Sequence, residues 1–169
     1  SYSVTGVQTC ALPICWSRTF LARLAEGGAR RLVGVGTCAE RLVPLQGEGA
    51  PLYARCKDEL RRFMLDGLPG ARCAWARLFY PYGVGEARQR LVSSLIAAFL
   101  AGRSFPLRCP DTRKDYVHVA DAGSALATLG TSRTAGLVEV GTGTGVRLGD
   151  LAAMVRSEER RVGKECRSR

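Results

Sequence analysis

Short apolar runs that alternate with helix-like segments constrain the fold of this 169-residue chain more than any other feature. Arg31–Gly36, Cys73–Phe79 and Leu137–Val140 have the length and composition of buried strands. Tyr116–Val119 is a further short extended segment. Strands that alternate with helices predict parallel βαβ units, so we expect an α/β fold built on a parallel sheet.

Five segments carry apolar residues at helical spacing and are expected to form helices: Trp16–Glu26, Leu52–Leu65, Arg90–Ala101, Ala120–Leu129 and Leu148–Val155. In the first, Trp16, Phe20, Leu21 and Leu24 form the predicted apolar face. In the second, the apolar residues are Leu60, Phe63 and Met64. Glycine and proline punctuate Glu40–Pro51 and Pro81–Gly85, which are therefore expected to be loops.

The composition argues against several classes of function. Of the 25 basic residues 22 are arginine, and they are scattered without interleaved aromatics. The net charge of +10 therefore indicates a solvated surface better than a nucleic-acid interface. Seven cysteines with no C-x-x-C pair, beside one histidine, exclude zinc-site spacing. With no apolar run long enough for a membrane helix and no signal peptide, we expect free thiols in a cytoplasmic protein that needs no metal.

The two ends of the chain look foreign to the rest. Val4–Ile14 resembles the in-frame translation of a common sequencing adapter, and Arg156–Arg169 resembles that of the opposite adapter. We therefore expect residues 1–14 and 156–169 to be adapter-derived tails around a natural segment, 15–155, from an environmental read. That segment has a net charge of about +7, because the last fourteen residues hold six basic and three acidic side chains. The alternative is a pair of natural disordered tails.

Tyr53 and Lys57 form the most informative local pattern. Residues i and i+4 share one face of a helix, so the phenol and the ammonium can point into one site. A nearby cation favours the phenolate and lowers a tyrosine pKa that is otherwise about 10. Such a pair can act as a general acid and base toward a substrate hydroxyl. Alone, this spacing also arises by chance.

Four further blocks give the pair its context. In chain order they are Val33–Glu40, which ends a strand at Thr37, then Arg77–Gly83, Arg113–Asp121 and Val138–Gly143. Together with Tyr53-x-x-x-Lys57 they resemble the extended short-chain dehydrogenase/reductases, the family of NAD-dependent sugar-nucleotide epimerases and dehydratases. The resemblance covers about residues 16–155 and departs from the family pattern at Tyr80, where asparagine is common, and at Lys114, where arginine is usual.

The resemblance implies a fold, a cofactor and a reaction. The fold would be an incomplete Rossmann-type, doubly wound parallel sheet that lacks the N-terminal βαβ half and retains part of the small substrate-binding region. The cofactor would be NAD or NADP and the substrate a nucleotide sugar, in a parent enzyme that is a homodimer. The family's glycine-rich pyrophosphate turn would precede Val33, so we expect this fragment to be inactive.

The resemblance also assigns roles to individual residues. The implied catalytic residues are Thr37, Tyr53 and Lys57. The implied cofactor-binding residues are Tyr53, Lys57, Phe79 and Pro81. The implied substrate-binding residues are Thr37, Tyr80, Arg113 and Lys114.

Other interpretations remain open at this point. A keto-reductase of the same fold would use the same three catalytic residues, and a basic nucleic-acid-binding module would use none of them. His118 is expected to be structural, and Cys38 and Cys56 are expected to be inert thiols. Gly141–Gly145 is not a dinucleotide-binding fingerprint, because the third glycine position is Val146.

Overall fold

The computed structural model describes residues 6–167 and divides the chain into two compact units. Unit 1 contains the residues up to Phe79 together with Asp121–Val140. Unit 2 contains Tyr80–Ala120 and the residues from Gly141 onward. Each unit is therefore built from two separate stretches of sequence.

Unit 1 is organised around a three-stranded parallel sheet in the order β1, β2, β6. These strands span Arg31–Thr37, Arg72–Leu78 and Gly136–Val140. The central strand β2 is buried without interruption from Cys73 to Arg77, as is typical of a strand covered on both faces. The three strands and their parallel pairing confirm the predicted α/β sheet.

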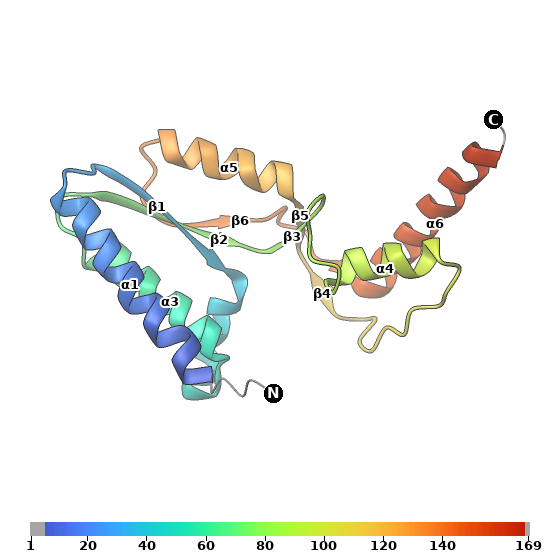
Figure 1. The fold of residues 1–169 in the computed structure, drawn as a ribbon, viewed down its shortest axis with the longest axis horizontal. Helices are drawn as coiled ribbons and strands as arrows, with labels where there is room; N and C mark the ends of the chain where they lie inside the picture. Colours follow the sequence, from blue (N-terminus) through green and yellow to red (C-terminus); the bar gives the residue numbers. More distant parts are fainter. Residues whose placement is uncertain (1–5, 168–169) are drawn as a thin grey trace. The chain divides into compact units, whose positions relative to one another are not determined.

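Helices cover both faces of this sheet, which makes it doubly wound as predicted (Figure 1). On one side lie α1 (Gly6–Glu26) and α3 (Leu52–Asp66), and on the other lies α5 (Val119–Thr131). The core under α1 and α3 is formed by Met64, Leu68, Cys73 and Trp75, with partly buried residues such as Leu21 and Phe63 packed around it.

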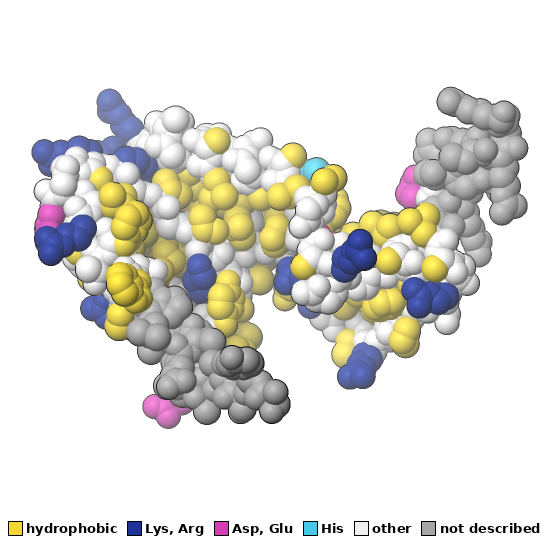
Figure 2. Space-filling model, viewed as in Figure 1, with side chains coloured by type: hydrophobic (Ala, Val, Ile, Leu, Met, Phe, Trp, Pro, Cys, Tyr) yellow, Lys and Arg dark blue, Asp and Glu magenta, His cyan; other side chains and the backbone are white. Residues whose placement is uncertain are grey.

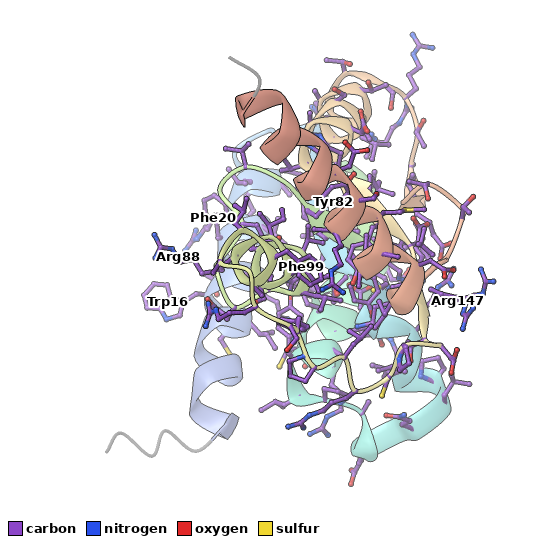
Figure 3. All side chains as sticks on the ribbon, turned by 90° about the vertical axis from the view of Figure 1, so that its right-hand side faces the viewer. Trp16, Phe20, Tyr82, Arg88, Phe99 and Arg147 are labelled. Atoms are coloured by element: carbon purple, nitrogen blue, oxygen red, sulfur yellow. The ribbon has the colours of Figure 1, made fainter. Side chains whose placement is uncertain are left out.

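The apolar face of α1 differs from the one expected. Trp16 and Phe20 are 74% and 63% exposed, and Figure 3 shows the Trp16 ring directed away from the ribbon. Leu21, Ala22 and Ala25 pack on the core instead. The helix also begins at Gly6, ten residues before the predicted start. The core-facing side of α1 therefore carries Leu21, Ala22 and Ala25, and the larger aromatic residues lie on its outer side.

The stretch Glu40–Pro51, expected to be a loop, contains three short helical turns. A 3-10 helix spans Cys38–Leu42, α2 spans Val43–Gln46, and a second 3-10 helix spans Gly47–Gly49. The prediction of a loop was wrong because local capping, together with a proline in the first turn of α2, stabilises turns too short to show a helical period.

Unit 2 consists of two small strand pairs and two helices. β3 (Tyr80–Tyr82) pairs in parallel with β5 (Tyr116–His118), and β4 (Arg113–Lys114) pairs antiparallel with β7 (Val146–Arg147). The prediction of a loop over Pro81–Gly85 is therefore wrong for Pro81 and Tyr82, which belong to β3. The strands β4 and β7, with two residues each, were too short to be predicted from the sequence.

The two helices of unit 2, α4 (Leu91–Leu100) and α6 (Leu148–Arg167), contact each other. Phe99 is buried on α4, and the guanidinium carbon of Arg156 lies 5.5 Å from the centre of its ring. The helix α6 continues twelve residues past its expected end at Val155, into the adapter-like segment. Within the described residues, no helix combines the length and the apolar character needed to cross a membrane.

Candidate functional site

Thr37 lies at the carboxyl end of β1, where ligands bind in open α/β sheets. Its side-chain oxygen accepts a hydrogen bond from the Ala39 backbone at 3.3 Å and so caps the 3-10 helix that follows. The Thr37 backbone N–H donates to the Glu40 carboxylate at 2.8 Å. Because the hydroxyl acts as an acceptor in the cap, its own proton can still be donated to a ligand.

Lys57 connects α3 to the strand that ends at Thr37. Its ammonium donates to the backbone oxygen of Val35 at 2.9 Å, two residues before Thr37. Tyr53 lies one helical turn earlier on α3 and is 55% exposed. Lys57 therefore reaches toward the end of β1 from the same helix that carries Tyr53.

A buried carboxylate that the sequence reasoning missed holds this end of β1 in place. The side chain of Glu40 is fully buried and accepts hydrogen bonds from the indole nitrogen of Trp75 at 3.1 and 3.2 Å. It also accepts from Nε of Arg77 at 3.2 Å. Thr37 and Glu40 form a capping box, and the spacing T-x-x-E is the sequence signal that could have identified it.

Arg77 links Glu40 to a second carboxylate nearer the surface. Its Nη1 lies 3.4 Å from Glu139 on β6, and Nε of Arg41 donates to the same carboxylate at 3.1 Å. The hydrogen bond from Arg41 lowers the pKa of Glu139 and outweighs its partial burial, and Glu139 in turn raises the pKa of Arg41. The Arg41 guanidinium also lies 5.0 Å from the centre of the Phe79 ring.

The residues predicted to line the cofactor site fall in different units. Phe79 ends the stretch of unit 1 that contains β2, and its backbone N–H donates to Val140 at 3.1 Å. Pro81 belongs to unit 2, where it lines a hollow of about 320 Å³ with Tyr82, Arg90 and Val119.

Two of the predicted substrate-binding residues contact each other in unit 2. The ammonium of Lys114 lies 4.5 Å from the centre of the Tyr80 ring, and Tyr80 in turn lies 5.6 Å from Tyr116. Arg113 is exposed, and its Nη1 donates to the backbone oxygen of Gly145 at 2.9 Å. Burial raises the pKa of Tyr116, and nearby Tyr80 adds to this effect.

Asp115, between β4 and β5, anchors the loop Gly141–Gly145. Its carboxylate accepts from the backbone N–H groups of Thr142 and Gly143, both at 2.9 Å, and from the Thr142 hydroxyl at 2.6 Å. Burial alone would raise the pKa of Asp115, but these hydrogen bonds outweigh it and hold the pKa below its ordinary value. The loop therefore binds a carboxylate of its own chain.

The remaining candidate residues have structural partners. Nδ1 of His118 accepts from the backbone N–H of Ala120 at 3.3 Å, and its ring packs edge-on against Tyr82. In the part of the chain that the structure describes, no cluster of histidine, cysteine and carboxylate side chains could hold a metal ion. Neither Cys38 nor Cys56 forms a disulfide bond with another described cysteine.

No protein-family model and no curated protein sequence matches the chain. The fold is nevertheless shared with solved structures. An NAD-dependent NDP-hexosamine 5,6-dehydratase, TunA, involved in tunicamycin biosynthesis, superposes with a TM-score of 0.73 at 21% identity over 87% of this chain. A UDP-N-acetylglucosamine 4-epimerase from Methanobrevibacter ruminantium M1 superposes with a TM-score of 0.71 at 15% identity over 90% of this chain.

A third similar structure is the UDP-glucose 4-epimerase of Thermus thermophilus in complex with NAD, with a TM-score of 0.69 and 20% identity over 85% of this chain. The chain spans about half the length of these structures, namely 52%, 56% and 52% of the dehydratase and the two epimerases in the order given. At these identities the likeness establishes the fold, which is that of NAD-dependent sugar-nucleotide epimerases and dehydratases.

Proposed function

We propose that the chain is part of an NAD(P)-dependent sugar-nucleotide epimerase or dehydratase whose acid/base residue is Tyr53. One observation carries the proposal. In a fold shared with such enzymes, Lys57 on α3 hydrogen-bonds to β1 two residues before Thr37, at the sheet edge where ligands of open α/β sheets bind. Tyr53 lies one turn away on the same helix and is an exposed residue.

The residues at this edge fit the nicotinamide-ribose end of a dinucleotide. Lys57 uses one of its three N–H donors on Val35, so two remain for a ribose hydroxyl. The exposed Tyr53 leaves space beside it for a ligand. NAD or NADP, when bound, would accept and return a hydride. Among its described residues, unit 1 contains no glycine-rich turn that leads from a strand into a helix. These residues therefore do not supply the backbone N–H groups that would bind the pyrophosphate of the cofactor.

The proposed chemistry assigns one task to each side chain. Tyr53 removes a proton from a sugar hydroxyl and later returns it to the keto oxygen. The Lys57 ammonium stabilises the phenolate electrostatically. The Thr37 hydroxyl donates a hydrogen bond to the reacting oxygen, while its cap and the bond to Glu40 keep that hydroxyl in place. In unit 2, Arg113 and Lys114 would supply positive charge for the substrate diphosphate, and Tyr80, whose ring centre lies 4.5 Å from the Lys114 ammonium, would contact the substrate. Phe79 of unit 1 and Pro81 of unit 2 are the further residues proposed to bind the cofactor.

The test is a chimera in which a family-typical N-terminal half precedes residue 15. We expect the chimera to bind NAD or NADP and to convert a nucleotide sugar. Tyr53→Phe should abolish turnover and largely spare cofactor binding, because it removes only the hydroxyl and leaves the other cofactor contacts in place. Tyr82→Phe, which removes a phenol hydroxyl in unit 2, is the matched control and should retain activity. Turnover by the Tyr53→Phe chimera at the parent rate would disprove the assignment.

The same chimera distinguishes the proposed reaction from that of a keto-reductase. An epimerase or dehydratase returns the hydride within each turnover, so the absorbance of reduced cofactor stays constant. A keto-reductase oxidises one reduced cofactor for each product formed. Stoichiometric cofactor consumption would therefore favour the reductase and leave the role of Tyr53 intact.

A further inference from the structure

Three arginines surround a hollow at the amino ends of β1 and β2. Arg30 and Arg31 stand at the start of β1 and Arg72 at the start of β2, where the Arg72 backbone N–H donates to the Arg30 oxygen at 2.9 Å. The hollow has a volume of about 440 Å³, and its other lining residues are Gly70, Gly130, Thr131 and Ser132. Figure 2 shows Lys and Arg side chains gathered at this end of unit 1.

The positive charge of the hollow is not compensated within the described part of the chain. None of the three arginines forms an ion pair with a described carboxylate. Nη2 of Arg31 donates to the backbone oxygen of Leu129 at the end of α5. Since a helix carboxyl end carries about half a negative charge, the site retains a net charge of about +2.5.

Arg31 gives a second, independent indication that an anion belongs in this hollow. Its Nε and Nη1 are buried and have no hydrogen-bond partner among the described residues. A guanidinium stays charged at neutral pH, and a buried charge without a counter-ion is costly. An anion in the hollow that Arg31 lines would compensate this charge, while the exposed Arg30 and Arg72 could contact the anion directly.

We propose that this hollow binds a small phosphate-bearing ligand. Arginine is suited to phosphate oxygens because its planar fork donates two parallel hydrogen bonds. The volume lies in the range of small-molecule sites, and the arginines converge on one hollow rather than forming an extended stripe. Both features favour a small ligand over a nucleic-acid strand.

The site is separate from the one proposed for catalysis. Thr37 lies at the opposite end of β1, six residues from Arg31. At about 3.3 Å per residue the two ends are about 20 Å apart. Binding in the arginine hollow is therefore an additional property of unit 1. A test of this binding neither supports nor contradicts the proposed roles of Tyr53 and Lys57.

The test is a titration of the full 169-residue chain with inorganic pyrophosphate, followed by calorimetry and by NMR of the backbone amides. We expect saturable binding with shifts at Gly70 and Gly130. Arg30→Gln and Arg72→Gln should each weaken binding about tenfold, since each removes a charge-assisted hydrogen bond. Arg72→Lys should lose less, and Arg103→Gln, an exposed arginine of unit 2, should bind as the parent chain does.

The remaining outcomes contradict the proposal. Absence of saturable binding, or an equal loss with Arg103→Gln, would show that the arginines do not form a site. A short single-stranded oligonucleotide that binds at the same amides and is not displaced by pyrophosphate would assign the surface to nucleic acid instead. Because Arg30 and Arg72 are exposed, far-UV circular dichroism of both variants should match the parent chain. The amide shifts of the unmodified chain test the site without any variant.

Discussion

At the scale of single residues, the packing of Trp75 depends on two glycines of the neighbouring strand. A Cβ atom at Gly34 would overlap the Trp75 ring and the Met64 sulfur, and one at Gly36 would overlap the ring and the Glu40 carboxylate. The absence of side chains at these positions lets the indole lie across β1 and reach Glu40. The same glycines therefore allow the buried hydrogen bonds that hold Thr37.

Gly36→Ala should lower the free energy of unfolding by about 1–3 kcal/mol, since an extra methyl group in a filled core displaces its neighbours. Urea denaturation followed by tryptophan fluorescence measures the change. Gly49→Ala is the matched control, because a Cβ there meets no atom within 4 Å. Equal midpoints for the two variants would show that the indole does not occupy this position.

Asp115 provides a test by pH. Its pKa is lower in the folded state than in the unfolded chain, so its stabilising contribution is complete above about pH 4 and is lost as the pH falls through the lowered value. The protection factors of the Thr142 and Gly143 amides, that is, the exchange rates of an unfolded chain at the same pH divided by the observed rates, should therefore fall on acidification below pH 4. Asp115→Asn should show lower protection factors at neutral pH and little further change in acid, whereas Asp66→Asn, on the exposed end of α3, should behave as the parent does.

At the scale of elements, α1 and α6 run from the body of each unit into the segments that resemble adapter. Among the described side chains of α1, Leu21, Ala22 and Ala25 pack on the core, and Arg18 pairs with Glu59 of α3 at 3.0 Å. In α6 Arg156 contacts Phe99, and a cation–π contact of this kind contributes about 1 kcal/mol at most when exposed. Residues 1–5 and 168–169 of the expected tails lie outside the described residues.

Deletion of residues 1–14 and 156–169 should therefore leave the melting temperature unchanged to within about 2–4 °C, the shift expected for 1 kcal/mol in a chain of this size. Differential scanning calorimetry of the shortened and full chains makes the comparison. The variant Leu21→Ala, which truncates a residue packed on the core, is the positive control and should melt well below both. A loss on deletion as large as that of Leu21→Ala would show that the ends belong to the native fold.

At the scale of the whole molecule, the chain spans about half of the solved structures that share its fold. Its described strands and helices supply a candidate catalytic edge in unit 1 and basic and aromatic residues in unit 2. They contain no glycine-rich turn that leads from a strand into a helix to hold a pyrophosphate. The glycine-containing segment Gly141–Gly145 lies between the strands β6 and β7. Its Thr142 and Gly143 N–H groups donate hydrogen bonds to Asp115.

We therefore expect the 169-residue chain to bind NAD and NADP no more tightly than millimolar and not to turn over a nucleotide sugar. Loss of the pyrophosphate contacts removes several kcal/mol, and each 1.4 kcal/mol weakens affinity about tenfold. Isothermal titration of the purified chain with each dinucleotide measures this directly. A micromolar dissociation constant would reveal a cofactor site that the proposed arrangement does not contain.

The local order of strands and helices could be predicted from the sequence because it depends on short-range patterns. Apolar runs and helical spacing identified the three strands of the unit 1 sheet and the bodies of α3, α4 and α5. The i, i+4 spacing placed Tyr53 and Lys57 one turn apart, and the end of an apolar run placed Thr37 at the end of β1. The catalytic roles of these three residues stay predictions.

Only the tertiary structure decided which distant residues meet. Arg41 and Glu139 are 98 positions apart, and their contact depends on the order of the strands, which no local pattern encodes. The same holds for the hydrogen bond from Arg31 to Leu129 near the end of α5, and for the hydrogen bond that Asp115 accepts from Thr142 in the loop after β6. The exposure of Trp16 and Phe20 also depends on tertiary packing. The helix α1 has two apolar faces, and the face with Leu21, Ala22 and Ala25 is the one that packs on the core.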